Sequence, residues 1–167
     1  MLIMTTRGIH GFDFLLGTWN VRNRKILNNK DPRCEEWIEF EAVSDVTTLL
    51  HGFGNLDRYF VPDSPAGEAF EAVTLRLFDP SSETWQIWWS STRSPGVLDP
   101  PVKGHFEDGH GVFDCHDVID GTPVEVRFEW TADATSPVWR QSFSWDAGVT
   151  WKKNWTMDFS RIDQIRG

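Results

Sequence analysis

Apolar and polar residues alternate along most of this chain, and the alternation returns at regular intervals. The clearest run covers residues 123–131, whose apolar positions are Val124, Val126, Phe128 and Trp130, with charged residues between them. A period of two places successive side chains on opposite faces of a β-strand. We therefore expect half-buried strands, and in this run we expect the apolar side chains to face inward.

The same pattern, bounded by turns rich in Gly, Pro, Asp and Asn, predicts strands over most of the chain. The predicted strands cover residues 18–26, 35–43, 46–53, 56–61, 70–78, 84–93, 102–107, 112–119, 123–131, 138–145 and 151–162. Short connections join nearly all of them, which favours antiparallel neighbours. Asp120-Gly121 is a typical two-residue hairpin turn.

These elements predict an all-β fold, an antiparallel up-and-down barrel of about eight to ten strands, because closure removes exposed strand edges. A two-sheet sandwich is the alternative, but the meander connections favour the barrel. Residues 9–16 alone show apolar residues at helical spacing. We expect them to form a short N-terminal helical segment that plugs or flanks one end of the barrel. Residues 1–167 are expected to form one domain.

The entry to the first predicted strand reads Gly17-Thr18-Trp19 and resembles the Gly-x-Trp motif of lipocalins and other calycins. In that family the Trp closes the barrel floor, and an Arg near the end of the last strand packs across its ring. Arg161 stands in a suitable place for this cation–π contact. The resemblance implies structural roles for both side chains.

Over its whole length the chain is similar to a family of uncharacterised bacterial lipocalin-like proteins. The matching stretches are residues 12–19, 54–59, 75–80, 88–93 and 154–157. This resemblance implies a calycin-type barrel with a pocket, and it implies no particular activity.

A second motif, residues 144–151, reads Ser-Trp-Asp-Ala-Gly-Val-Thr-Trp and is similar to the Asp-box of sialidases and related propeller proteins. There the Asp caps the turn through backbone N–H groups, the Gly adopts a positive φ, and the Trp packs beneath. A sialidase would need several copies at blade spacing, whereas this chain has one. We therefore expect the motif to stabilise a hairpin.

The composition and net charge of the chain restrict the kinds of partner that we expect. The chain carries ten Trp, twelve Phe and one Tyr, a set that suits a wide interior lined with rings. A formal net charge of −9, with no offsetting Lys/Arg cluster, argues against a nucleic-acid partner. No apolar stretch approaches a membrane span, and the N-terminus lacks a signal-peptide pattern, so we expect no membrane partner and a cytoplasmic location. Cys34 and Cys115 are expected to be free thiols.

The first functional hypothesis is a binding module that holds a small apolar or aromatic molecule among the Trp rings. Arg76 and Arg93 would meet a carboxylate or phenolate on that ligand. The candidate ligand contacts are Arg76, Trp85, Trp89, Arg93, Trp130 and Trp155. The oligomeric state stays open.

The alternative is an enzyme of isomerase, cyclase or decarboxylase type on the same scaffold, working without a cofactor. His116 with Asp114, or His105, would supply the acid–base group, and Arg93 would stabilise negative charge. The alternation leaves open which face of residues 112–119 is interior. The five histidines lie in different segments without ligand spacing, so we expect no metal. A third hypothesis is a packed barrel that serves protein interaction.

Overall fold

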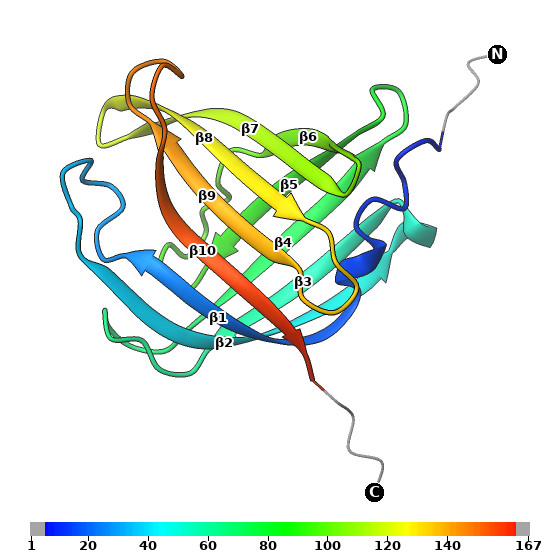
Figure 1. Ribbon diagram of the computed structural model, residues 1–167, viewed down its shortest axis with the longest axis horizontal. Coiled ribbons are helices and arrows are strands. Elements are labelled where there is room, and N and C mark those ends of the chain that lie inside the picture. Colours follow the sequence, from blue (N-terminus) through cyan, green and yellow to red (C-terminus); the bar gives the residue numbers. More distant parts are fainter. Residues whose placement is uncertain (1–5, 163–167) are drawn as a thin grey trace, which may run out of the picture.

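A computed structural model describes residues 6–162 of the chain as a closed, antiparallel barrel of ten strands (Figure 1). The strands are β1 (Gly17–Ile26), β2 (Trp37–Leu49), β3 (Gly54–Val61), β4 (Phe70–Asp79), β5 (Thr84–Ser91), β6 (Val102–Glu107), β7 (His110–Ile119), β8 (Thr122–Thr131), β9 (Val138–Ser144) and β10 (Lys152–Arg161). Each strand pairs with its neighbours in the sequence, and β1 pairs with β10 to close the barrel. The all-β, up-and-down prediction is confirmed.

One boundary prediction is wrong, because the strands expected over residues 35–43 and 46–53 form the single 13-residue strand β2. The polar residues Ser44 and Asp45 suggest a turn in the sequence, yet Ser44 is fully buried and continues the inward face between Ala42 and Val46. This single strand pairs with both β1 and β3. Residues 37–46 pair with β1, and residues 43–49 pair with β3.

The predicted helical segment over residues 9–16 is a series of tight turns that ends in a three-residue 3-10 helix, η1 (Asp13–Leu15). Its hydrogen bonds span three residues, as in Leu15 N–H to Phe12 O at 3.0 Å. Phe12 is buried against the rings of Trp85, Phe106, Phe113 and Trp130. The segment therefore plugs one end of the barrel, as predicted, and we call this the closed end.

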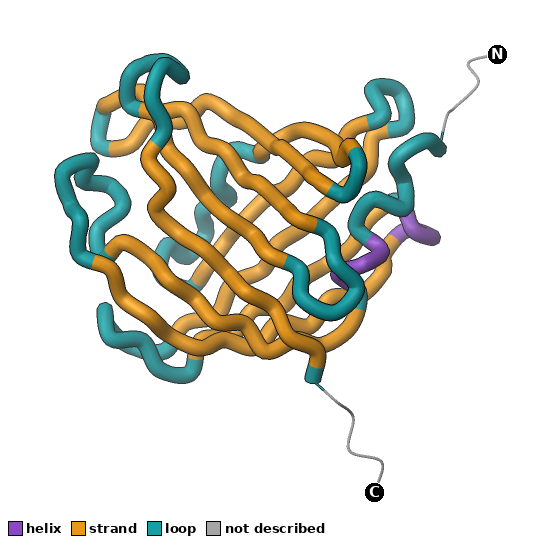
Figure 2. The backbone as a smooth tube through the Cα atoms, in the orientation of Figure 1, coloured by secondary structure: helices purple, strands orange, loops and turns teal. Residues whose placement is uncertain are grey.

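A second 3-10 helix, η2 (Leu50–Gly52), also lies at the closed end, between β2 and β3 (Figure 2). No helix within residues 6–162 has the length and apolar character needed to cross a membrane.

Trp19 and Arg161 join the two ends of the described chain at the closed end. Trp19 is completely buried, and its indole N–H donates to Leu15 O at 2.8 Å. The guanidinium carbon of Arg161 lies 4.1 Å from the centroid of the Trp19 ring. The same guanidinium donates to the backbone oxygens of Phe14, Leu16 and Ala134. The expected cation–π contact is confirmed.

The Asp-box residues form the turn between β9 and β10. Asp146 accepts the Thr150 backbone N–H at 2.8 Å, and Gly148 adopts a φ of +87°. Ser144 Oγ donates to Asp146 and accepts the Gly148 N–H. Hydrogen bonds from the Thr150 hydroxyl, the Thr150 N–H and the Ser144 hydroxyl lower the pKa of Asp146 to about 2. The motif therefore performs the expected hairpin role.

The loops of residues 27–36, 62–69, 92–101, 120–121 and 145–151 meet at the opposite end, which we call the open end. β5 and β6 pair only through residues 85–87 and 102–104, so the wall between them stops short of this end. The loop of residues 92–101 continues the wall. Asp99 N–H donates to Trp89 O at 2.9 Å, and Ser90 Oγ donates to Val97 O at 2.7 Å.

Candidate functional site

A cavity of about 710 Å³ occupies the half of the barrel nearer the open end. Its wall includes the side chains of four tryptophans, Trp89, Trp130, Trp139 and Trp155. Aromatic rings pack the closed end, so the interior is solid at one end and hollow at the other. The volume lies within the range of pockets that hold small organic molecules.

Five of the six predicted ligand contacts lie on the wall of this cavity. They are Arg76, Trp89, Arg93, Trp130 and Trp155. Trp85 faces inward but packs against Phe12 and Phe78, and its indole N–H donates to Gly8 O at 3.0 Å. The structure brings the five together, and their contact with a ligand stays a prediction.

The predicted acid–base residues lie elsewhere. Asp114 and His116 are on the exposed face of β7, where Arg127 donates two hydrogen bonds to Asp114 at 2.8 and 3.2 Å and His116 pairs with Glu125. The exposed His105 pairs with Glu107 at 3.2 Å. None of the three lines the cavity.

The inner face of β7 instead carries Phe113, Cys115, Asp117 and Ile119. This settles the face that alternation left open. Within residues 6–162 no three His, Cys, Asp or Glu side chains converge on a possible metal position.

The cavity floor contains a buried ion pair between Arg76 on β4 and Asp57 on β3. Arg76 Nη2 donates to Asp57 at 3.0 Å, and Nη1 donates to Asn55 Oδ1 at 2.9 Å. Ser44 Oγ donates to the second Asp57 oxygen at 2.6 Å. Burial lowers the pKa of Arg76, and the charge of Asp57 opposes that effect. The pair is electrically neutral and almost fully hydrogen-bonded.

A second buried network holds two rings of the cavity wall. Asn23 Oδ1 accepts the Tyr59 hydroxyl at 2.6 Å and the Trp155 indole N–H at 2.9 Å. Asn23 is fully buried, and burial raises the pKa of Tyr59, so the phenol stays protonated. One amide from β1 thus positions aromatic rings from β3 and β10.

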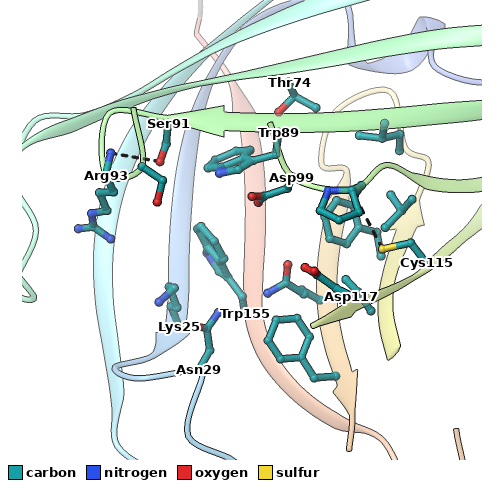
Figure 3. Close-up of a pocket in the computed structure, with 18 of the residues that line it drawn as sticks. Lys25, Asn29, Thr74, Trp89, Ser91, Arg93, Asp99, Cys115, Asp117 and Trp155 are labelled. Carbon is teal, nitrogen blue, oxygen red and sulfur yellow. Dashed lines mark hydrogen bonds between the residues drawn. The ribbon is translucent and has the colours of Figure 1, made fainter. Parts of the chain in front are cut away.

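Two cationic side chains, Lys25 and Arg93, line the cavity near its mouth (Figure 3), and the exposed Lys30 lines it as well. Lys25 Nζ lies 5.4 Å from the centroid of the Trp155 ring, and the Arg93 guanidinium carbon lies 3.9 Å from that of Phe70. Arg93 also donates to Ser64 Oγ at 3.4 Å. Within residues 6–162 neither cation forms an ion pair with a carboxylate.

Acidic groups line another part of the wall. Figure 3 shows Asp99 and Asp117 on the opposite side of Trp89 and Trp155 from Arg93 and Lys25. Burial, followed by the charge of Asp117, raises the pKa of Asp99.

Cys115 lies beside these acids, and its thiol donates to Pro100 O at 3.8 Å. Burial and the neighbouring carboxylates raise the pKa of this thiol to about 12, so it is protonated at neutral pH. A protonated thiol is a poor nucleophile and a poor metal ligand.

Sequence reasoning missed five of these polar residues, namely Asn23, Lys25, Asp57, Asp99 and Asp117. Two of them carried a usable signal. In the first strand Asn23 and Lys25 continue the face of Trp19 and Val21 at a period of two, although the Arg-Asn-Arg-Lys run suggests a solvated edge. Asp99 lies in a Pro-rich loop, and no pattern in a loop indicates that it completes a barrel wall.

The barrel is similar to a solved structure of an S-type phycobiliprotein lyase, CpeS, from Guillardia theta. The match has a TM-score of 0.58 and 13% identical residues, and it covers 92% of this chain and 91% of that one. No protein-family model and no curated protein matches the chain. The comparison therefore shows a shared barrel fold.

Proposed function

We propose that this barrel binds a small aromatic or largely apolar molecule that carries an anionic group. The ring-lined cavity receives the body of the ligand, and Lys25 and Arg93 hold its anion. The pair of cations that faces the cavity without a carboxylate partner carries this proposal.

Electrostatics support an anion at this position. Burial, and then the charge of Arg93, lower the pKa of Lys25 to about 8. The fold thus holds two like charges at the mouth of an apolar cavity, which opposes folding. An anion bound between them would relieve the repulsion and gain charge-assisted hydrogen bonds.

In this proposal Arg76 stabilises the fold and does not bind the anion, although the sequence analysis predicted that it would contact a ligand carboxylate or phenolate. Asp57 already neutralises its guanidinium at 3.0 Å, so a ligand carboxylate placed there would face the Asp57 carboxylate. The similar barrel from Guillardia theta is named a phycobiliprotein lyase, and at 13% identity it supports the fold alone.

Two fluorescent probes with the same aromatic body test the proposal. One is 8-anilinonaphthalene-1-sulfonate, which is anionic, and the other is N-phenyl-1-naphthylamine, which lacks the sulfonate. We expect both to bind, and we expect the double variant Lys25→Met/Arg93→Gln to weaken binding of the sulfonate by about tenfold or more. Affinity for the neutral probe should change by less than about twofold, because its contacts are with rings.

The matched control is Lys153→Met/Arg22→Gln, which removes two charges from exposed positions of β10 and β1. Its affinity for both probes should equal that of the wild type. Equal losses for both probes in the cavity variant, or no loss for either, would overturn the role given to the two cations.

Binding of the sulfonate should also depend on pH. Lys25 is cationic below its pKa of about 8 and neutral above it, so affinity should fall as the pH rises from about 7 to 9. The sulfonate stays ionised across this range. The variant Lys25→Met should therefore lose the pH dependence, and persistence of that dependence would assign it to another group.

A further inference from the structure

Two polar side chains on the cavity wall are more than nine-tenths buried and have unsatisfied groups. Thr74 on β4 is 6% exposed, and Gln141 on β9 is 8% exposed. Gln141 Nε2 donates to Asn154 Oδ1 at 2.9 Å, which leaves the Gln141 carbonyl oxygen for the cavity. Within residues 6–162 neither that oxygen nor the Thr74 hydroxyl has a hydrogen-bond partner. Among residues 6–162 the enclosed side-chain atom without a partner is Arg76 Nε, so the Gln141 oxygen and the Thr74 hydroxyl are open to the cavity, where a ligand can reach them.

The cavity wall away from Lys25 and Arg93 also presents hydrogen-bond acceptors. Besides the Gln141 carbonyl oxygen, this part of the wall presents the carboxylates of Asp99 and Asp117, and neither forms an ion pair within residues 6–162. Asp117 accepts one local hydrogen bond, from the Val118 N–H at 2.7 Å. These acceptors lie apart from Lys25 and Arg93, so a ligand that spans the cavity can meet both kinds of group.

We infer that the ligand is an N-heteroaromatic carboxylic acid, whose carboxylate meets Lys25 and Arg93 and whose ring N–H donates to the Gln141 carbonyl oxygen. Thr74 and Asp117 offer further acceptors for N–H groups on a larger ring system. This inference rests on the proposed function and adds a second requirement to it. A ligand with an anion but no donor would leave the buried oxygen of Gln141 unpaired, which costs affinity.

Indole-3-acetate and 1-benzothiophene-3-acetate form a suitable probe pair, because they have similar size and the same carboxylate and differ in the N–H. Their affinities would be measured by calorimetry and by displacement of the anilinonaphthalene sulfonate. We expect the wild type to bind the indole acid about tenfold more tightly. In Gln141→Leu the two affinities should come within about twofold, with the benzothiophene acid bound as in the wild type.

The variants separate this inference from the function on which it rests. Lys25→Met/Arg93→Gln should weaken both acids alike, because both carry the carboxylate. Equal affinities of the wild type for the two acids, with that shared loss retained, would overturn the N–H inference and leave the proposed function standing. Failure of both acids to displace the sulfonate would also overturn it.

Folding of Gln141→Leu is checked by circular dichroism, because the substitution removes the amide N–H that donates to Asn154 Oδ1. If that variant does not fold, Gln141→Met takes its place, because Met keeps the length of the side chain and removes the carbonyl oxygen. A preference for the indole acid that survives in a folded Gln141 variant would overturn the assignment to this oxygen. Loss of the preference would support it.

Discussion

Replacing Asp57 with alanine should lower the free energy of unfolding by about 3–5 kcal/mol, the usual cost of breaking a buried ion pair from one side. Arg76 is only 3% exposed and would keep its hydrogen bond to Asn55 but lose its ionic partner Asp57. An unpaired cation would then remain buried at the floor of the cavity, and Ser44 would lose its acceptor. Chemical denaturation of the variant and the wild type measures the difference.

The matched control replaces both partners, as in Asp57→Leu/Arg76→Met. Removing both charges should recover most of the lost stability, because well-packed apolar residues often substitute for a buried pair at little cost. A loss below about 1 kcal/mol for Asp57→Ala would contradict the structural role given to the pair. A double variant as unstable as the single one would assign the loss to packing.

Replacing Trp19 with alanine should cost about 3–5 kcal/mol of unfolding free energy, as for other large-to-small changes in a core. The ring is completely buried and packs edge-on against Phe159. Its indole N–H donates to the Leu15 carbonyl oxygen and so fixes the segment that plugs the barrel. The Arg161 guanidinium packs on the face of the ring. The change would leave a cavity at the closed end, where the first and last strands meet. Thermal and chemical denaturation both report this loss.

Two milder substitutions separate the contributions of this cluster. Trp19→Phe keeps most of the packing and removes the indole N–H, so it should cost about 1 kcal/mol. Arg161→Met removes an exposed guanidinium and should cost about 1–2 kcal/mol. A melting temperature of Trp19→Ala equal to that of the wild type would show that the ring does not support the closed end.

Much of the fold could be predicted because alternation is a local signal. A strand that buries one face must repeat apolar residues at every second position, and the runs in β5 and β8 do so. The error at Ser44 has the same origin. A polar residue on the inward face looks like a turn until its partner is known, and that partner is Asp57, thirteen residues away.

The candidate site was only partly predictable, because its wall is assembled from many strands. The inward positions of Trp89, Trp130 and Trp155 follow from alternation, whereas residues 70–78 carry apolar side chains on both faces and leave the direction of Arg76 open. Nothing local shows that Asp57 neutralises Arg76 or that Asp114 and His116 lie outside. Strand pairing brings together residues that are distant in the sequence, and these contacts decide which charged side chains form ion pairs.

The amino-acid sequence by itself determined the strand period, the turns and the aromatic interior, because each depends on spacing along the chain, and the resemblance to calycins implied the contact of Trp19 with Arg161. Only the tertiary structure decided that the barrel is plugged at one end and hollow at the other, and that Lys25 and Arg93 face the hollow without a carboxylate partner among residues 6–162. The physical reason is closure. Joining β1 to β10 sets which side chains meet across the interior, and those distances set burial, charge pairing and pKa.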